Sequence, residues 1–295
     1  MVKMGYATIL SMPNQIHPQA VLGKNIKLGD HNIVGPGVII EDGVQIGSHN
    51  QIMANVFIAK GTTIGDHNAI HFGALIGHAP QDLAYQNEET FTVIGNQNVI
   101  REYVTIHRGT KAGTSTTIGH NNFLMANVHV AHNCTLGNQI IMVNLASLTG
   151  HCHVEDQAFI SGMTGFHQFS KIGRLAMVSA LSAINKDIPP FMICGGRPGV
   201  IQGINVVGMR RAGIPQTVRS EIKEAYKLLY RSDLNVSQAL QEIEIRFFSP
   251  EIKNLVHFIK ESKRGICDGQ GSAQETLLSK KGVRAGNSEE DFEAE

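Results

Sequence analysis

The chain has 295 residues, with 25 basic and 25 acidic side chains, so its formal charge at neutral pH is zero. Much of the acidic charge lies near the C-terminal end, which leaves the body mildly basic; this balance does not indicate a nucleic-acid-binding protein, but it suits an acidic protein partner. No stretch has the pattern of a cleavable export signal or of a membrane span, so we expect a soluble, cytoplasmic protein.

A six-residue repeat of apolar side chains runs through most of the chain. From Ile16 to Ile76 every sixth residue is Ile, Leu or Val. The same period returns in residues 94–106 and again in residues 118–184, where Met and Phe each occupy one position. A helix has a period of 3.6 and a strand a period of 2, so neither produces this spacing. A short, fixed repeat of this length predicts a solenoid of stacked units.

Three such hexads are expected to close one triangular coil of eighteen residues, with each buried aliphatic above its counterpart in the previous coil. Adjacent coils then pair as parallel strands roughly 4.8 Å apart. The residue two places before the aliphatic is small or β-branched at several positions, which suits a second inward site: Ala20, Val38, Val44, Val56, Thr62, Ala74. We therefore predict a parallel β-helix over residues 1–190. Its spacing resembles that of the hexapeptide-repeat acyltransferases, and this resemblance alone implies a left-handed coil.

Glycine often follows the aliphatic residue directly, and we expect it to supply unusual backbone angles in the turns. The positions concerned are Gly23, Gly29, Gly35, Gly47, Gly65, Gly95, Gly119, Gly137 and Gly173.

Two insertions interrupt the hexads, at residues 78–93 and 107–117. Insertions in a solenoid become loops on one face, which is often the working face. The repeat ends near Ile184, where Asp187-Ile188-Pro189-Pro190 breaks the strand pattern.

The spacing changes to a helical one in residues 191–266, which we predict to be a small helical domain. Ile222, Ala225 and Leu229 share one helix face, and Pro250 suits the start of a further helix. Residues 267–295 carry Gly, Ser and charged side chains with few large apolar ones, so we predict a disordered acidic tail.

Two of the four cysteines, Cys134 and Cys152, are eighteen residues apart and should therefore stack in consecutive coils. A disulfide or a metal pair is one interpretation of this spacing. We favour the alternative, in which two small apolar side chains fill the second inward site.

The histidines form a column. His132, His151 and His167 come two, three and one residues after the corresponding hexad positions of three successive coils, so they should lie on one corner of the prism. His129 lies close to the same edge, and His107 opens the second insertion. Such a column predicts a polar groove along the solenoid.

Three interpretations of this column compete. The histidines could be solvated turn residues in a non-catalytic scaffold. They could bind metal between subunits, as in the hexapeptide-repeat carbonic anhydrases, although residues that alternate across a strand do not converge on one point, so we expect no metal site. In the third interpretation one histidine is a general base and the others bind a hydroxylated or anionic substrate.

Several segments together resemble the family of bacterial UDP-N-acetylglucosamine O-acyltransferases, which catalyse the first step of lipid A biosynthesis. The resemblance covers about residues 16–266, and its most specific segment is 127–137, NVHVAHNCTLG. Other matching segments are QDL at 81–83, REYVTIHRGT at 101–110, LTGH at 148–151, GMTGFHQF at 162–169, DIPP at 187–190 and YKLLYRS at 226–232.

The resemblance implies roles for individual residues. His132 resembles the general base that takes the proton of the sugar 3-hydroxyl, oriented by Asn133, and the N–H of Gly150 resembles the oxyanion donor. Residues that match contacts to the sugar nucleotide, the acyl group or the phosphates are Gln81, Asp82, Ala84, His107, His129, His151, His167, Gln168, Asn205 and Arg211. Ser179 and Ala180 match the position that limits acyl-chain length, and the methyl group of Ala180 argues against the longest chains.

The resemblance also implies the partners. The donor would be a 3-hydroxyacyl chain on the phosphopantetheine of acyl carrier protein, an acidic partner that suits the mildly basic body. The acceptor would be a UDP-sugar, the assembly a homotrimer with active sites between neighbouring prisms, and no other cofactor would be required.

Four positions depart from the family pattern. Asn133 replaces an Asp, Ala84 a Lys, Val207 a Glu and Ala212 an Arg. Because a lysine near the sugar 3-position would repel an ammonium group and Ala84 would not, an alternative acceptor is the 3-amino analogue, which would give an amide product.

Overall fold

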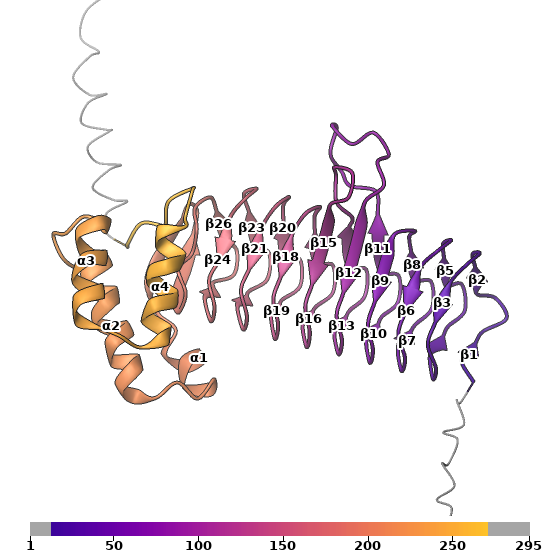
Figure 1. Ribbon diagram of the computed structural model, residues 1–295, viewed down its shortest axis with the longest axis horizontal. Helices are drawn as coiled ribbons and strands as arrows, with labels where there is room; N and C mark the ends of the chain where they lie inside the picture. Colours follow the sequence, from indigo (N-terminus) through magenta and orange to yellow (C-terminus); the bar gives the residue numbers. More distant parts are fainter. Residues whose placement is uncertain (1–12, 271–295) are drawn as a thin grey trace, which may run out of the picture.

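The computed structural model describes residues 13–270, and in them a triangular prism of stacked coils carries a bundle of helices at one end (Figure 1). Three sheets, here named A, B and C, form the faces of the prism and contain 11, nine and eight strands among the described residues. From β1 to β23, each strand pairs in parallel with the strand three places further along the chain, so one coil contributes one strand to each face. The predicted left-handed parallel β-helix followed by helices is confirmed.

The strands are short, as expected when a corner follows every few residues. Sheet A contains β1 (Gln15–Ile16), β4 (Ile33–Val34), β7 (Gln51–Ile52), β10 (Ala69–Ile70), β13 (Val99–Ile100), β16 (Phe123–Leu124), β19 (Ile141–Met142), β22 (Phe159–Ile160), β25 (Met177–Val178), β27 (Met192–Gly196) and β28 (Gly199–Ile204). Sheet B contains β2 (Val21–Leu22), β5 (Ile39–Ile40), β8 (Phe57–Ile58), β11 (Leu75–His78), β14 (Thr105–His107), β17 (His129–Val130), β20 (Ser147–Leu148), β23 (Gly165–Phe166) and β26 (Ala183–Ile184). Sheet C contains β3 (Lys27–Leu28), β6 (Gln45–Ile46), β9 (Thr62–Ile64), β12 (Phe91–Ile94), β15 (Ser115–Ile118), β18 (Thr135–Leu136), β21 (His153–Val154) and β24 (Lys171–Ile172).

The hexad side chains form the core. From Val34 to Ile184 every one of them is at most 4 % exposed, and the second inward site is also filled as predicted, for example by Val38 and Ala74. Ile16 and Leu22 are exceptions, because they lie in the first described coil and no earlier coil among residues 13–270 packs beneath them. Stacking therefore buries the repeat, and a single coil could not do so.

The glycines that follow the aliphatic residues have a different role from the one predicted. None of them has a positive φ; the left-handed residues come two places later, as at His49 and His67. The glycines are needed for space instead. A Cβ on Gly95 would lie 2.6 Å from the carbonyl oxygen of Gly119, and one on Gly119 2.5 Å from that of Gly137. Successive coils approach closely at this corner, and only glycine permits it.

A ladder of buried asparagines, which the sequence analysis did not identify, joins five coils along sheet A. Each Nδ2 donates to a glycine carbonyl at the neighbouring corner, and each Oδ1 accepts the backbone N–H of the next rung. The rungs are Asn32, Asn50, Asn68, Asn98 and Asn122. The ladder satisfies polar backbone groups that the core would otherwise leave unpaired.

The region expected to be helical begins with strands. β27 and β28 form an antiparallel hairpin that extends sheet A, and the helices start only at α1. They are α1 (Val206–Arg211), α2 (Gln216–Tyr230), α3 (Val236–Arg246) and α4 (Pro250–Lys260). Pro250 lies at the first turn of α4, as predicted, after the N-cap Ser249.

The tail expected from residue 267 lies outside the described residues from 271 onward. Its first four residues are described and pair with the prism: the N–H groups of Cys267 and Gln270 donate to the carbonyls of Asp187 and Ile201 at 2.8 and 2.9 Å. Within residues 13–270, no helix combines the length and the apolar character that a membrane crossing requires.

Cys134 and Cys152 fill the inward site, as predicted. Both are buried free thiols, and the Sγ of Cys134 donates to the carbonyl of Thr149 at 3.1 Å.

Candidate active site

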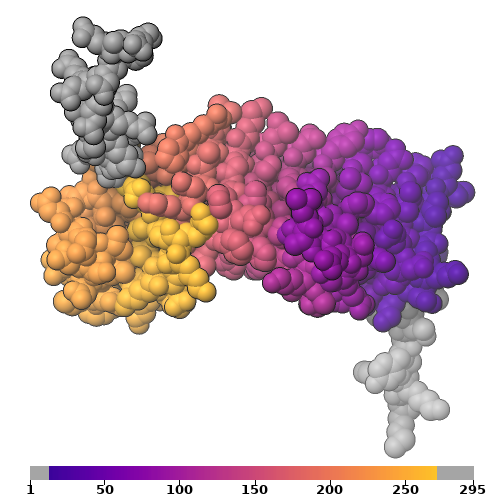
Figure 2. All heavy atoms as spheres, turned by 90° about the horizontal axis from the view of Figure 1, so that it is seen from above, coloured from indigo at the N-terminus to yellow at the C-terminus, as the bar shows by residue number. Residues whose placement is uncertain are grey.

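Both insertions and the histidine column lie at the corner where the chain passes from sheet B to sheet C. The first insertion connects β11 to β12 and the second connects β14 to β15. His132 lies in the turn after β17, and His151 in the turn after β20. The space-filling view shows the insertions as a lobe on the side of the prism (Figure 2). Chain segments up to seventy residues apart are thus brought to one place.

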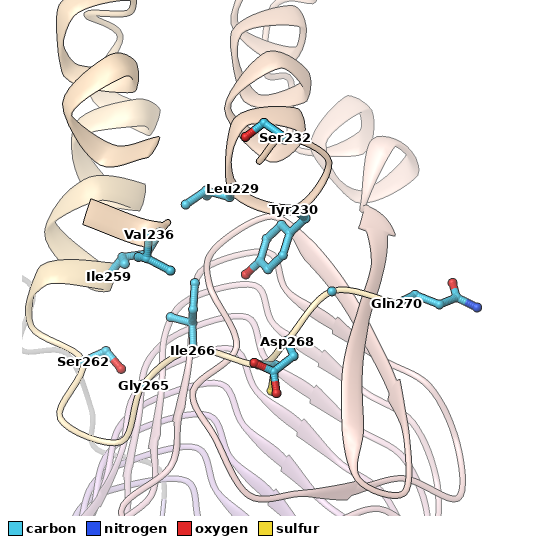
Figure 3. Close-up of a pocket in the computed structure, with 12 residues that line it drawn as sticks. Leu229, Tyr230, Ser232, Val236, Ile259, Ser262, Gly265, Ile266, Asp268 and Gln270 are labelled. Carbon is cyan, nitrogen blue, oxygen red and sulfur yellow. The ribbon is translucent and has the colours of Figure 1, made fainter. Parts of the chain in front are cut away.

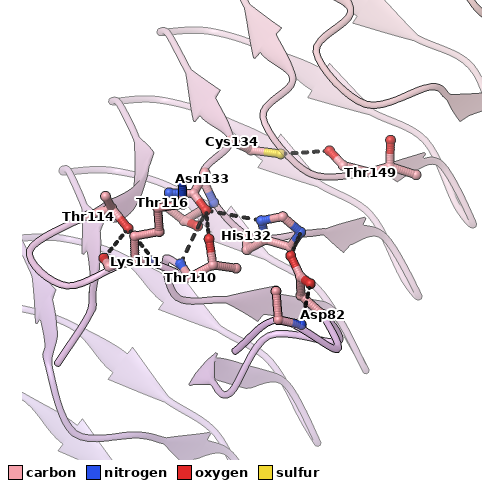
Figure 4. Close-up of polar contacts among 10 residues, drawn as sticks. Asp82, Thr110, Lys111, Thr114, Thr116, His132, Asn133, Cys134 and Thr149 are labelled. Atoms are coloured by element: carbon pink, nitrogen blue, oxygen red, sulfur yellow. Dashed lines mark hydrogen bonds and ion pairs between the residues drawn. The ribbon is translucent and has the colours of Figure 1, made fainter. Parts of the chain in front are cut away.

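His132 is held at this corner by a polar contact at each ring nitrogen (Figure 4). Its Nδ1 lies 3.0 Å from Oδ1 of Asn133, and its Nε2 lies 3.6 Å from a carboxylate oxygen of Asp82. The other oxygen of Asp82 accepts the N–H of Ala84 at 2.9 Å, which orients the carboxylate. Only 4 % of His132 is exposed. Nε2 therefore faces Asp82 of the first insertion while Nδ1 is held by Asn133, which leaves Nε2 as the nitrogen suited to proton transfer.

Asn133 is anchored on several sides. Its Oδ1 accepts the backbone N–H of Thr110 at 3.2 Å and the Thr110 hydroxyl at 2.9 Å. Its own N–H donates to Oγ1 of Thr116 at 2.8 Å. Its φ is +59°, a left-handed conformation that asparagine tolerates better than most residues. The side chain beside the imidazole is consequently fixed from the second insertion.

Gly150 lies directly over the His132 ring. A Cβ at this position would be 2.3 Å from Cε1 and 2.5 Å from Nε2 of His132. The N–H of Gly150 makes no hydrogen bond to any residue in the described part of the chain. An unpaired backbone donor beside a candidate base is the arrangement that an oxyanion-stabilising site requires.

The neighbouring histidines are uncharged at neutral pH. His151 packs edge-on against His132, with ring centroids 5.3 Å apart, and stacks on Phe169 at 4.6 Å. On sheet B, Nδ1 of His129 lies 2.7 Å from the Thr105 hydroxyl. Burial, with a smaller effect of the His132 imidazole, lowers the pKa of both His129 and His151. As neutral groups they both donate and accept hydrogen bonds, which suits hydroxyl groups of a substrate.

His107 is the most strongly perturbed of these groups. Burial, followed by the neighbouring His129 imidazole, lowers the pKa of His107 to about 4. Its Nδ1 is buried, with no hydrogen-bond partner among the described residues.

We expect the free energy of unfolding to fall as the pH drops from about 6.5 to 4. The folded pKa of His107 lies below the ordinary value of 6.5, so the unfolded chain binds the proton first. The stability that this difference provides is complete at neutral pH, and about 3 kcal/mol of it is lost by pH 4. Denaturant unfolding of the wild type and of His107→Gln at about pH 7, 5.5 and 4 measures it. The variant should show the shallower decline, and parallel pH dependences would contradict this assignment.

Asn205 and Arg211 do not lie at this corner. They line a groove of about 530 Å³ between sheet A and α1, with Ile141, Phe159 and Met177 on its apolar side. Asn205 is the N-cap of α1: its Oδ1 accepts the N–H of Gly208 at 2.8 Å and its Nδ2 donates to the carbonyl of Leu175 at 2.9 Å. Both ends of its amide are therefore engaged within the fold, whereas Arg211 is exposed.

The other predicted site residues are exposed or lie elsewhere. Gln81, Ala84, His167 and Gln168 are exposed on the insertion or on the turn after β23, next to the same corner. The predicted acyl-chain ruler, Ser179 and Ala180, does not line the groove beside α1; Oγ of Ser179 instead lies 3.5 Å from Oε1 of Gln202. No three His, Cys, Asp or Glu side chains within residues 13–270 are arranged to hold a metal ion.

A separate pocket of about 540 Å³ lies between α2, α4 and residues 265–270, and none of the predicted site residues lines it (Figure 3). The Tyr230 hydroxyl points into it and has no hydrogen-bond partner among the described residues.

Sequence reasoning missed Thr110 and Thr116, which hold Asn133. The available signal was their position: both lie in the second insertion, which was expected on the working face.

The hexad-built prism and the histidine corner define a transferase of the hexapeptide-repeat class. The profile described as bacterial transferase hexapeptide (six repeats) matches residues 43–78. A second profile, described as domain 2 of UDP-N-acetylglucosamine O-acyltransferase, matches residues 187–267.

Whole-chain comparisons are more specific. An acyl-[acyl-carrier-protein]–UDP-N-acetylglucosamine O-acyltransferase of Synechocystis is 45% identical over 203 residues, which cover 67% of this chain and 74% of that protein. The crystal structure of a UDP-N-acetylglucosamine acyltransferase from Bacteroides fragilis has a TM-score of 0.78 at 42% identity, covering 86% of this chain and 97% of the other. The Francisella novicida enzyme has a TM-score of 0.84 at 34% identity, covering 88% and 96%. The chain belongs to the UDP-N-acetylglucosamine O-acyltransferase family.

Proposed function

We propose that the protein transfers a 3-hydroxyacyl group from the thioester of acyl carrier protein to the 3-hydroxyl of UDP-N-acetylglucosamine, the first step of lipid A biosynthesis. The observation that carries the proposal is the corner itself. His132 has its Nδ1 held by Asn133 and its Nε2 on the side of Asp82, beside Gly150 with its unpaired N–H. The Synechocystis relative is named as an O-acyltransferase that uses these two substrates.

The reaction follows from this geometry. Nε2 of His132 takes the proton of the acceptor hydroxyl as its oxygen attacks the thioester carbonyl. The carbonyl oxygen becomes an oxyanion, which the N–H of Gly150 stabilises. Collapse of the tetrahedral intermediate breaks the carbon–sulfur bond, and the proton on Nε2 passes to the departing thiolate. A base, an oxyanion donor and the donor's own phosphopantetheine supply every group in this scheme, so the proposal includes no resident cofactor.

We also propose that the active protein is a homotrimer. Along the corner between sheets A and B, four large apolar side chains are 46–57 % exposed: Tyr103, Leu145, Met163 and Leu181. All four adopt left-handed backbone angles, with φ between 54 and 63°, at a cost of about 1–2 kcal/mol each. Burial of this ridge around a threefold axis would offset that cost. Light scattering in solution should give three times the 32.0 kDa of one chain.

A homotrimer of this kind would explain why the predicted site residues lie in two separate places in one chain, the His132 corner and the groove beside α1. Around a threefold axis at the A–B corner, sheet B of one chain faces sheet A of the next. The corner that carries His132 in one chain would then lie beside the groove that Arg211 lines in the next chain. The apolar side of that groove suits an acyl chain, and Arg210 and Arg211 at the end of α1 suit the phosphates of the donor or the nucleotide.

The alternative acceptor, a 3-amino sugar nucleotide, is favoured by Ala84 and Asp82. Ala84 supplies no cation, and the Asp82 carboxylate beside Nε2 would attract an ammonium group. Lys111, from the second insertion, is however close enough for its charge to contribute to the lowered pKa of His151. This nearby cation favours the hydroxyl acceptor, which is why we propose it first.

A direct competition assay tests the function. Purified protein is given 3-hydroxyacyl carrier protein with UDP-N-acetylglucosamine or its 3-amino analogue, and the ester and amide products are separated by mass spectrometry. We expect ester formation, and we expect Ala84→Lys to reduce any amide formation by an order of magnitude or more through like-charge repulsion. A preference for the amine in the wild type would select the alternative acceptor, and transfer to neither would contradict the acyltransferase proposal.

A further inference from the structure

An asparagine beside a catalytic histidine can hold the imidazole in an inactive tautomer, whereas an aspartate cannot. Both carboxylate oxygens accept hydrogen bonds, whereas an amide has one accepting end and one donating end. If the Nδ2 end of Asn133 faced His132, Nδ1 would have to accept, and the ring proton would move to Nε2. Nε2 could not then act as the base. The chemistry of this corner therefore depends on which end of one amide faces the imidazole.

Thr110 decides the orientation of that amide. Its backbone N–H is a donor under all conditions, and it points at the Asn133 side-chain atom that contacts His132, 3.2 Å away. Its hydroxyl donates to the same atom at 2.9 Å. A donating NH₂ group at this position would face the N–H with no acceptor, in a site where Thr110 is buried. The atom must be Oδ1, so Nδ1 of His132, 3.0 Å from it, must carry the proton.

We propose that Thr110 is a positioning residue, which turns Asn133 into an obligate acceptor and thereby fixes the His132 tautomer whose Nε2, beside Asp82 and Gly150, keeps a free lone pair. It acts through Asn133 and touches no reacting atom. The catalytic part of this inference rests on the proposed function, whereas the tautomer part can be measured without any substrate.

The test is a double-mutant cycle combined with a spectroscopic measurement. Thr110→Val removes the hydroxyl, which makes the shorter of the two bonds to Oδ1, and keeps the side-chain shape and the backbone N–H at 3.2 Å, so it weakens the preference for Oδ1 without removing it. In the native Asn133 background it should lower kcat by about five- to tenfold, with KM little changed. In the Asn133→Asp background either oxygen can accept, so the same substitution should change kcat by less than about twofold. Thr110→Ser keeps the hydroxyl and should retain most of the activity.

Nitrogen-15 NMR of the His132 ring reads the tautomer directly in the full-length protein. The wild type should be protonated at Nδ1, and Thr110→Val should show an admixture of the Nε2-protonated form. Thr114→Val is the matched control, because it removes a hydroxyl from the same loop that bonds only within the loop, to Lys111.

Each outcome has a definite meaning. An Nε2-protonated wild type, or equal effects of Thr110→Val in both backgrounds, would overturn the inference. So would a loss of activity in Thr114→Val as large as that in Thr110→Val, since that would reflect general loosening of the loop. A wild type that transfers no acyl group but is protonated at Nδ1 would contradict the proposed function and would still support the tautomer assignment.

Discussion

Replacing His132 by alanine is expected to lower kcat by two to four orders of magnitude, the usual contribution of a positioned general base. Nε2 of His132 lies beside Gly150, and burial lowers the pKa values of the neighbouring His129 and His151. Their geometry also differs, since the Nδ1 of His129 is engaged by Thr105. KM for the sugar nucleotide should change much less than kcat, because the lost interaction develops in the transition state.

His153→Ala is the matched control for this variant. His153 lies on β21, where its side chain points outward from sheet C instead of lying at the histidine corner. It should retain near-wild-type kcat, and both variants should keep the oligomeric mass of the wild type. A His132→Ala protein with more than about a tenth of wild-type kcat would show that another group, with Asp82 the nearest, takes the proton.

The second large effect is expected from one added methyl group. In Gly150→Ala the Cβ would overlap the His132 ring, at 2.3 Å from Cε1, so either the imidazole or the turn must move. Because Gly150 does not have a positive φ, alanine is compatible with its backbone angles, and the damage comes from the collision alone. Displacing the base and the N–H donor together should lower kcat by a factor of about one hundred to one thousand.

Gly203→Ala provides the control for this substitution. Gly203 lies on β28, and no atom lies within 4 Å of where its Cβ would be placed. Its kcat should be close to that of the wild type. The two variants should have melting temperatures within a few degrees of each other, because Thr149 and His151 on either side of the buried Gly150 are exposed and the turn can shift. Equal kcat in Gly150→Ala and the wild type would exclude this glycine from the site.

The site could be predicted only where the repeat determined the position of a residue. His132 and His151 come two and three residues after corresponding hexad positions, so their common corner followed from the sequence alone. Thr110 belongs to an insertion, whose path is not set by the period, and its two hydrogen bonds to Asn133 span 23 residues. Arg211 was assigned to the same site by resemblance, whereas in a single chain it lies in a groove on another face.

The recurring glycines show the same limit of prediction from sequence. The sequence marked the recurring glycines correctly but suggested a role in backbone angles. At Gly95 and Gly119 the requirement is instead the closeness of the next coil, which depends on stacking and not on any local turn preference.

What the sequence by itself determined is the architecture and the chemical type of the corner, because a six-residue period fixes which side chains point inward and which residues stack from coil to coil. What only the tertiary structure decided is how the base is prepared. The direction of the Asn133 amide, and with it the protonated nitrogen of His132, depends on donors from a loop that the period does not reach. Hydrogen-bond direction requires two groups to be within about 3 Å with the right donor and acceptor, and no spacing along the chain encodes that distance.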